Sequence, residues 1–359
     1  AFAGEPLTSR RPPGYPFFLA VLYRLFGVRP EIVPFAQALL GALAALVVYA
    51  LGLRLAGSRR VGLVAAAVYA IYPHYVYYAR EVLSETLFFA LFWSALALLA
   101  GARRSAAVSL RELIGAGLLL GLAALVRPVV LLFLPVVPLW ALLVYRPRIR
   151  VACGAAAVVL VAACAVIAPW TVRNWRVHGQ FVPITTMGGT TLLGGNNEVV
   201  ADDPELYGQW IVPEHRLPGV AARIAGRSEV EADRIERDMA IDFLRENLRR
   251  VPELAAKKIA RFLNPLPHVG RAERLLMALT YGPVLLLGLL GLVLSARRAW
   301  SGEPVVVAHL TVVFFLGVAA VFWGSSRFRL TIEVLLIILA VEVVLRAREH
   351  RRAGARARP

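Results

Sequence analysis

The sequence is poor in acidic residues and in cysteine. Its 359 residues include 23 Asp and Glu against 40 Lys and Arg, a formal net charge of +17, and no aspartate precedes Asp202. Its two cysteines, Cys153 and Cys164, lie about 16 Å apart on a helix, too far for a disulfide, so we expect both to be packing residues. A signal-peptide pattern is missing too. Because the chain opens on Ala1, we expect it to lack its true N-terminus.

Hydrophobic residues are abundant instead. They make up 59% of the chain, and the mean hydropathy is +0.66. This composition excludes an ordinary soluble domain and indicates a membrane protein. The positive charge could suggest nucleic acid, but the charges lie in short clusters between apolar runs, and no basic surface is interleaved with aromatic residues. We therefore expect membrane lipids as partners, and no nucleic acid.

Apolar runs long enough to cross a membrane recur along the chain. Nine are predicted, at residues 33–56, 61–78, 83–100, 112–126, 129–145, 151–168, 273–295, 304–323 and 330–346. Arginine clusters follow alternate runs and so share one face, which is cytoplasmic by the positive-inside rule. The predicted domains are a membrane region at 1–168, with an outer juxtamembrane helix at about 14–27 and six spans, an extracytoplasmic domain at 169–272, a three-span region at 273–346 and a polybasic tail at 347–359.

The extracytoplasmic segment is the only sizeable soluble part. Its start alternates apolar and polar residues and is rich in Gly and Thr, which predicts strands and loops. Ser228 and Glu231 predict a capping box at the start of a helix. A second, amphipathic helix is expected from Pro252, with apolar and charged side chains on opposite faces: Leu254, Ile259, Phe262 and Leu263 against Glu253, Lys257, Lys258 and Arg261. The predicted fold class is an all-α polytopic membrane protein with a small α/β extracytoplasmic domain.

Several motifs occur in a fixed order: RRPPGYPFFLA, YYAREVLSETLFF, LVRPVVLLFLP, APWTVRNWRVHGQFVP with GGNN downstream, and SSRFRLTIEVLLIILA. Together they resemble the bacterial branch of the GT-C membrane glycosyltransferases, the group of the protein O-mannosyltransferases and aminoarabinose transferases (glycosyltransferase family 39). The resemblance runs from about residue 10 to 345. It implies a GT-C helical bundle in the bacterial inner membrane. It also implies an enzyme that transfers a sugar, with inversion, from a polyprenyl-phosphate donor to a lipid, glycan or protein acceptor on the extracytoplasmic side.

The resemblance also implies that a part is missing. The family's catalytic base is an aspartate in the first outer loop, after the first transmembrane helix, and this sequence starts beyond that point. We therefore expect the chain to lack that helix and that base, and to be inactive by itself. No cluster of histidines and carboxylates has convincing ligand spacing. The sequence leaves open whether a divalent cation serves as a cofactor.

Arginines at outer ends of spans are the predicted ligands of the donor phosphate, because the planar guanidinium pairs with phosphate oxygens. Arg127 ends a span; the alternative is that it reaches lipid head groups. Arg327 and Arg329 begin the last span, where the alternative is a solvated turn. Arg11 matches the family motif before PPGY, and its alternative role is to anchor the chain at the head groups.

Two carboxylates are the predicted catalytic residues. Glu85 lies one turn into a predicted span, where a charge is costly without a partner, and it falls where the family keeps a second acidic residue. Glu81, four residues earlier, is expected on the same helical face. Glu85 either contacts acceptor, sugar or metal, or it forms a structural pair with Arg80 or Arg127.

The remaining candidates are predicted to bind the donor sugar or phosphate. Tyr15 could shape the groove or donate a hydrogen bond, and Arg80 is a further cation beside Glu81. Arg173 and Asn174 lie where the chain leaves the membrane, and the alternative role for both is capping or anchoring. Asn196 resembles a family loop that faces the sugar; otherwise it forms a turn.

Two other functions compete with glycosyl transfer. A flippase or transporter for lipid-linked sugars would also bury charges, but such proteins usually show repeated halves with interrupted helices, whereas one outer segment breaks the pattern here. A polysaccharide polymerase or ligase would have a large outer loop with paired arginines. The RPPGYP turn and the PW–RN segment favour the transferase.

Overall fold

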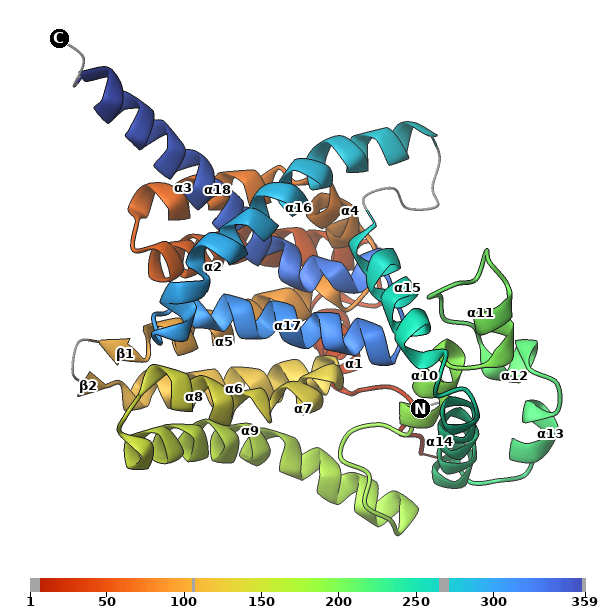
Figure 1. Ribbon diagram of the computed structural model, residues 1–359. Helices are drawn as coiled ribbons and strands as arrows, with labels where there is room; N and C mark the ends of the chain where they lie inside the picture. Colours follow the sequence, from red (N-terminus) through yellow and green to blue (C-terminus); the bar gives the residue numbers. More distant parts are fainter. Residues whose placement is uncertain (1–6, 105–106, 265–270, 357–359) are drawn as a thin grey trace. The chain divides into compact units, whose positions relative to one another are not determined.

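The computed structural model describes residues 7–104, 107–264 and 271–356 (Figure 1). Two compact units make up the chain. Unit 1 comprises Ala1–Pro13, Ile167–Asn264 and Phe314–Arg329. Unit 2 comprises Gly14–Val166, Pro265–Val313 and Leu330–Pro359. This division follows compactness and not membrane boundaries, so the domain limits drawn from the sequence stay predictions.

Unit 2 is a helical bundle. The helices wholly within it are α1 (Gly14–Phe26), α2 (Ile32–Ala56), α3 (Arg59–Ala70), α4 (Pro73–Arg80), α5 (Glu85–Gly101), α6 (Leu110–Val126), α7 (Val129–Phe133), α8 (Val136–Val144) and α16 (Arg271–Trp300). Three longer helices contribute to both units: α9 (Ile149–His178), α17 (Val306–Val321) and α18 (Ser326–Arg356). A two-residue antiparallel pair, β1 (Arg103–Arg104) with β2 (Ala107–Val108), joins α5 to α6.

The core of unit 2 surrounds α18, in which residues 330–340 are all buried. Side chains of neighbouring helices donate to its backbone: the indole of Trp93 to the carbonyl of Thr331 at 3.0 Å and the hydroxyl of Tyr75 to that of Leu330 at 2.8 Å. Helix α5 packs against both α2 and α6, and these helices run side by side in Figure 1. Gly121 of α6 brings the backbone of α9 close, as small residues do between membrane helices.

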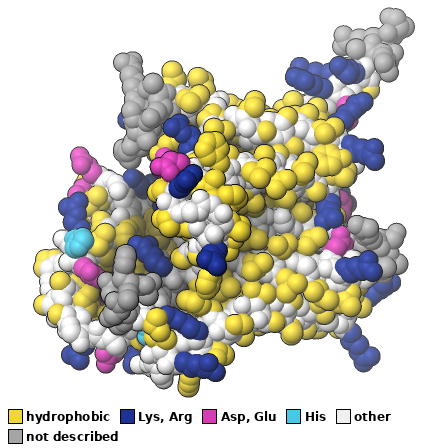
Figure 2. All heavy atoms as spheres, turned by 180° about the vertical axis from the view of Figure 1, so that it is seen from behind, with side chains coloured by type: hydrophobic (Ala, Val, Ile, Leu, Met, Phe, Trp, Pro, Cys, Tyr) yellow, Lys and Arg dark blue, Asp and Glu magenta, His cyan; other side chains and the backbone are white. Residues whose placement is uncertain are grey.

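Several helices of the described chain have membrane-spanning character. Three are long and apolar enough to cross a membrane: Ile32–Ala56, Ile149–His178 and Arg274–Trp300. Four further apolar helices are shorter: Gly14–Phe26, Glu85–Gly101, Val129–Val144 and Val306–Val321. Hydrophobic side chains predominate on the face drawn in Figure 2, and large ones such as Phe35 and Leu39 are exposed. A multi-pass membrane protein accounts for this surface.

Helices cover all nine apolar runs predicted from the sequence, although two runs are broken. The run at 61–78 divides into α3 and α4, and that at 129–145 into α7 and α8. Cys153 and Cys164 are both exposed on α9. The prediction that these cysteines are packing residues is therefore wrong.

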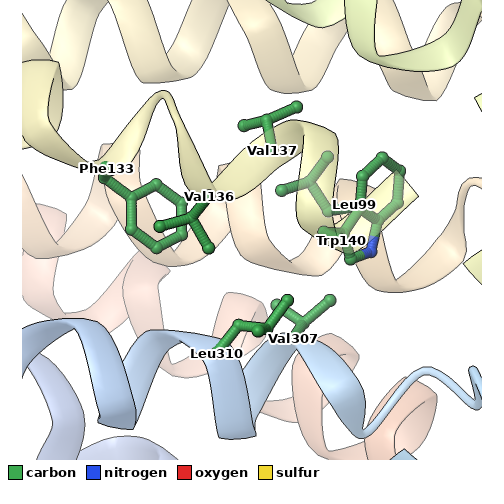
Figure 3. A pocket seen from close by; sticks show the side chains of 7 residues that line it. All are labelled: Leu99, Phe133, Val136, Val137, Trp140, Val307 and Leu310. Carbon is green, nitrogen blue, oxygen red and sulfur yellow. The ribbon is translucent and has the colours of Figure 1, made fainter. Parts of the chain in front are cut away.

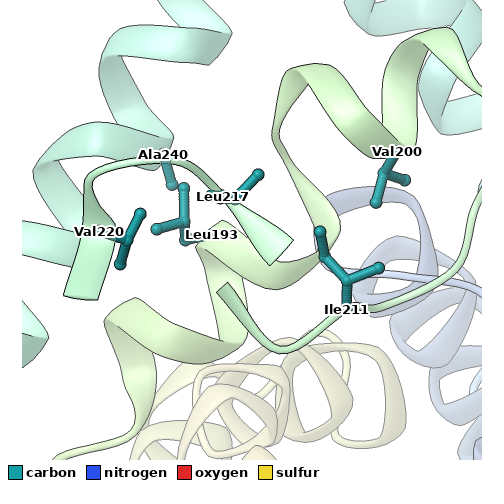
Figure 4. Packing of buried hydrophobic residues seen from close by; sticks show 6 residues of the cluster. All are labelled: Leu193, Val200, Ile211, Leu217, Val220 and Ala240. Carbon is teal, nitrogen blue, oxygen red and sulfur yellow. The ribbon is translucent and has the colours of Figure 1, made fainter. Parts of the chain in front are cut away.

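Unit 1 is helical as well. Its own helices are α10 (Gly188–Gly195), α11 (Glu198–Asp202), α12 (Pro213–Arg216), α13 (Val220–Ile224), α14 (Glu229–Glu246) and α15 (Val251–Leu263). A cluster of buried apolar side chains holds them together, drawn in Figure 4: Leu193, Val200, Ile211, Leu217, Val220 and Ala240. Within residues 169–264 the structure contains helices and loops but no strand. The predicted α/β character of this domain is therefore wrong.

Two local predictions in unit 1 have opposite outcomes. The capping box at Ser228 and Glu231 is present at the start of α14, as predicted. Helix α15, however, does not place all its charged residues on one face. Lys258 is buried together with Leu254 and Phe262, four residues away on either side. The sequence pattern misplaced this lysine because neighbouring segments cover that side of the helix.

Candidate active site

An ion pair joins the adjacent ends of α5 and α6. Arg127 follows the last residue of α6, and its Nη2 lies 2.5 Å from Oε1 of Glu85, the first residue of α5. The Nε of Arg127 also donates to the hydroxyl of Ser84 at 3.3 Å, and the guanidinium lies over the ring of Phe88. The Glu85 side chain is fully buried, and that of Arg127 is 12% exposed. The predicted structural pairing of Glu85 with Arg127 is therefore present.

Tyr15 is packed close to this pair by the glycine before it. A Cβ on Gly14 would lie 2.7 Å from Val126 and 2.9 Å from the backbone of Leu125, at the end of α6. Only glycine fits there, so the PPGY turn brings the start of α1 against α6. The phenol of Tyr15 donates to Gln37 at 2.9 Å and lies within electrostatic range of Glu85.

Gln37 is a buried polar residue that the sequence reasoning missed. It lies in α2 with no exposed surface, and its amide nitrogen donates to the carbonyls of Ala79 at 3.2 Å and Glu81 at 2.6 Å. This side chain therefore ties Tyr15 to the chain between α4 and α5. A polar residue within a long apolar run was the signal that could have found it.

Arg80 and Glu81 lie at the end of α4, and both are exposed. Glu81 has extended backbone and lies outside any helix, while Glu85 begins α5. The prediction that Glu81 and Glu85 share a helical face is therefore wrong, because the chain bends between them. Glu81 remains near Tyr15 through the hydrogen bond from Gln37 to its carbonyl.

In unit 1, the hydroxyl of Ser9 gathers several polar side chains. It donates to Asn174 at 2.8 Å, receives a hydrogen bond from Arg173 at 2.7 Å and lies 2.7 Å from the ring of His178. Asn174 is fully buried and also donates to the carbonyls of Val182 and Ile184. Arg173 and Asn174 thus have the anchoring role that was the alternative to substrate contact. Arg11, two residues after Ser9, is exposed.

The other predicted residues of unit 1 lie around the loop between α17 and α18. Asn196 is 1% exposed, and its amide donates to the carbonyls of Leu192 and Val321. Arg329 has no exposed surface and donates to the carbonyl of Asn264 at 2.6 Å. The predicted contact of Arg329 with a substrate phosphate stays a prediction. Arg327, by contrast, is half-buried.

Two carboxylates of α14 hold the first turn of α10. Asp233 accepts from the backbone N–H of Gly189 at 2.6 Å, and Glu236 accepts from the hydroxyl of Thr190. Burial raises the pKa of both carboxyls above their usual values, although these hydrogen bonds oppose the shift. Both therefore stabilise a helix N-terminus. In the part of the chain that the structure describes, no group of three or more His, Cys, Asp or Glu could hold a metal ion.

A small apolar cavity of about 10 Å³ lies in unit 2 between α5, α7, α8 and α17 (Figure 3). Its lining is Leu99, Phe133, Val136, Val137, Trp140, Val307 and Leu310. The volume is close to that of one water-sized probe, so this cavity holds no substrate. The site is better defined by the polar cluster at Arg127.

Residues 10–172 match the family model described as dolichyl-phosphate-mannose-protein mannosyltransferase. The matched range contains Arg11, Tyr15, Glu81, Glu85 and Arg127. Over these residues the match agrees with the resemblance to GT-C glycosyltransferases that the sequence motifs show. No curated protein matches this chain significantly.

Solved structures have the same fold. The archaeal oligosaccharyltransferase AglB from Archaeoglobus fulgidus, in complex with an inhibitory peptide and a dolichol-phosphate, superposes with a TM-score of 0.60 at 17% identity, over 98% of this chain and 45% of that one. The Archaeoglobus fulgidus oligosaccharyltransferase tethered to an acceptor peptide superposes with a TM-score of 0.57 at 14% identity, over 93% and 41%. This chain thus spans less than half the length of these structures, and the likeness shows the fold.

Proposed function

We propose that the protein transfers a sugar from a polyprenyl-phosphate donor to a lipid, glycan or protein acceptor, with inversion, on the extracytoplasmic face of a bacterial inner membrane. The match of residues 10–172 to a lipid-phosphate-sugar transferase family carries this proposal. Support comes from AglB, a structure of the same fold that holds a dolichol-phosphate. Further support comes from the packing of Tyr15, Glu85 and Arg127 into one cluster within the matched range.

The reaction explains why cations are needed. The acceptor attacks the anomeric carbon, the bond from that carbon to the phosphate oxygen breaks, and the polyprenyl phosphate leaves with that electron pair. The acceptor's proton passes to a carboxylate base. The phosphate goes from one negative charge as a diester to nearly two as a monoester. A cation held beside it stabilises the transition state more than the ground state, which is the condition for faster chemistry.

Arg127 is the residue that we assign to the donor phosphate. Its guanidinium has five N–H donors in a planar fork, so it can bind phosphate oxygens while Glu85 and Ser84 hold its orientation. Glu85 then acts through Arg127 as a positioning residue. Tyr15, whose hydroxyl donates to Gln37, is a further proposed ligand of the donor sugar or phosphate. The exposed carboxylate of Glu81 is our candidate for binding the acceptor, with Arg80 beside it.

In unit 1, Arg327 and Arg11 remain proposed ligands of the donor phosphate, since both have exposed surface. Arg329, Asn174 and Asn196 are buried among backbone carbonyls and support the loops that carry such residues. Arg173 supports the N-terminal segment through Ser9.

Transfer can be tested with the full-length protein in liposomes, using radiolabelled polyprenyl-phosphate sugars and a mixed extract of lipids and glycans as acceptor. We expect labelled product with inverted anomeric configuration, and loss of product in Arg127→Ala. Arg60→Ala is the matched control, because Arg60 forms an exposed ion pair with Glu349 elsewhere in unit 2. Movement of the labelled donor across the bilayer without any product would favour the flippase alternative and contradict the transferase.

A further inference from the structure

Lys258 is a lysine buried inside unit 1. Only 3% of its surface is exposed, whereas the side chain of its neighbour Lys257 is 28% exposed and pairs with Glu253. The ammonium of Lys258 donates to the side-chain oxygen of Asn196 at 2.6 Å and to the carbonyl of Val321 at 3.1 Å. Neither acceptor is a carboxylate. A buried ammonium held by neutral acceptors costs folding free energy, so its retention needs an explanation.

The carbonyl of Val321 explains part of this arrangement. Val321 is the last residue of α17, where backbone carbonyls lack helical partners and the helix dipole is negative. The side chain of Asn196 donates to the same carbonyl at 3.0 Å. Lys258 and Asn196 therefore fix the end of α17 from two sides, and Lys258 supplies the cation that this helix end favours.

Arg329 makes the complementary contact. It lies in the first turn of α18 and donates to the carbonyls of Phe262 and Asn264, at the end of α15. Lys258 of α15 thus holds the end of α17, while Arg329 of α18 holds the end of α15. The loop from residue 322 to 325 connects α17 to α18, so both helices that it joins are tied to α15.

Close backbone contacts tighten the same loop. The N–H of Gly324 donates to the carbonyl of Gly208 at 2.8 Å. A Cβ on Gly324 would collide with the carbonyl of Lys258, and a Cβ on Gly195 with that of Phe322. This loop leads directly into the first turn of α18, which carries Arg327. The backbone N–H of Arg327 is held by the hydroxyl of Ser325, the last residue of the loop, at 3.2 Å.

A role in packing alone does not explain Lys258. A methionine would fill a similar volume without a buried charge, whereas burial lowers the pKa of this lysine to about 8. The ammonium is therefore retained at a cost in stability. What it adds over methionine is two directed hydrogen bonds to the loop-bearing elements.

We propose that Lys258 is a positioning residue for donor binding: its ammonium, held between Asn196 and the C-terminal carbonyl of α17, fixes the 322–325 loop and so the place of Arg327 in the first turn of α18. This inference rests on the proposed function for the role of Arg327. The fixing of the loop by Lys258 does not depend on which substrate the protein binds.

The test compares Lys258→Met with Lys257→Met in the full-length protein. Hydrogen exchange of the peptide covering residues 320–330 reports the loop, and transfer kinetics report the site. We expect Lys258→Met to exchange faster in this peptide and to raise the donor KM by about tenfold or more, the effect of losing hydrogen bonds to a charged group, while kcat at saturating donor and the acceptor KM stay within about twofold. Lys257→Met is expected to match wild type in all of these.

A double-mutant cycle separates an effect of Lys258 exerted through Arg327 from a general loss of folded structure. In an Arg327→Ala background, Lys258→Met should raise the donor KM no further, because the residue through which it acts is gone. Unchanged exchange at 320–330 would overturn the inference, as would a fall in kcat alone or KM effects that simply add. If the wild-type protein transfers no sugar from any polyprenyl phosphate, the proposed function fails, while hydrogen exchange still decides whether Lys258 fixes the loop.

Discussion

The two units satisfy their buried and half-buried cations in different ways. In unit 2 each of three half-buried arginines has a carboxylate partner, and two of them, Arg54 and Arg298, also donate to a backbone carbonyl. The pairs are Arg127 with Glu85 at 2.5 Å, Arg54 with Glu112 at 3.0 Å and Arg298 with Glu342 at 2.7 Å. In unit 1, Lys258 and Arg329 donate to an amide oxygen and to carbonyls at helix ends.

This difference has a physical meaning. A carboxylate carries a full charge, so removing one member of such a pair leaves the other buried and uncompensated. The carbonyl groups at helix ends carry only a partial negative charge, and they do not change their protonation state with pH. Unit 2 therefore holds cations whose charge is balanced and can be shared with a substrate anion. Unit 1 holds cations that fix the positions of chain segments.

The largest effect is expected from breaking the ion pair of Arg127 with Glu85 in unit 2. Arg127→Ala should reduce transfer by about 100-fold or more, since it removes a donor to the developing phosphate charge. It should also lower stability by about 3–5 kcal/mol, because Glu85 is left buried without its cation. Transfer kinetics and thermal unfolding in detergent measure the two effects.

The double variant Arg127→Gln with Glu85→Gln separates the two roles of this pair. It should regain most of the lost thermal stability while remaining inactive. Recovery of both stability and transfer would show that the pair serves the fold alone, and the assignment of Arg127 to the donor would be wrong.

The next largest expected effect is a pH dependence of the free energy of unfolding, caused by Lys258 in unit 1. The unfolded chain keeps the proton of Lys258 up to its ordinary pKa of 10.5, whereas the folded chain releases it at about 8. Between these values the unfolded state holds more protons, so the free energy of unfolding should rise with pH, by about 3 kcal/mol in all. Below pH 8 the burial cost is present in full. Thermal unfolding between pH 7.5 and 10.5 should therefore differ in slope between wild type and Lys258→Met; parallel curves would contradict this.

A smaller effect is expected at the turn before α1. Gly14→Ala adds a methyl group against Val126 and Leu125 and should cost about 1–3 kcal/mol by overpacking, with reduced transfer because Tyr15 is displaced. Gly154→Ala is the matched control: a Cβ there meets nothing within 4 Å, and alanine favours the helix. Equal unfolding temperatures for the two variants would show that the turn adapts to the added methyl.

The smallest effect lies at the exposed start of α14. Ser228→Ala removes the hydroxyl that accepts a hydrogen bond from the backbone N–H of Glu231 and so caps α14. This change should lower the free energy of unfolding by about 1 kcal/mol. Donor KM should not change, because this cap touches neither kind of buried cation. Ser228→Thr keeps an oxygen at the same place and should restore most of the unfolding temperature; a further loss would show that the cap is not the cause.

Local patterns in the sequence predicted local structure well. The apolar runs coincide with helices, and the Ser228 capping box is present. The pairing of Glu85 with Arg127 was among the alternatives, because a charge inside a span needs a partner. These features depend on residues near one another in sequence or on a rule that applies to every membrane helix.

The failures share one cause, which is contact between distant segments. The Gly- and Thr-rich stretch before residue 195 forms a helix, since Asp233 and Glu236 of α14 supply acceptors for its first turn. Lys258 was placed on a polar face although other segments cover it. The contact of Arg329 with the end of α15, far away in the sequence, was not foreseen either. No local pattern reports which helix ends a distant cation will reach.

Two contacts link α15 to its neighbours, that of Lys258 with the end of α17 and that of Arg329 with the end of α15. They limit which insertions and deletions this region can accept during evolution. Shortening or lengthening α17 by one residue would turn its last carbonyl away from Lys258, and a shift in α18 would pull Arg329 off the end of α15. Related sequences should therefore keep the number of residues between α17 and α18 constant, with glycine at position 324, where a Cβ would collide with the carbonyl of Lys258.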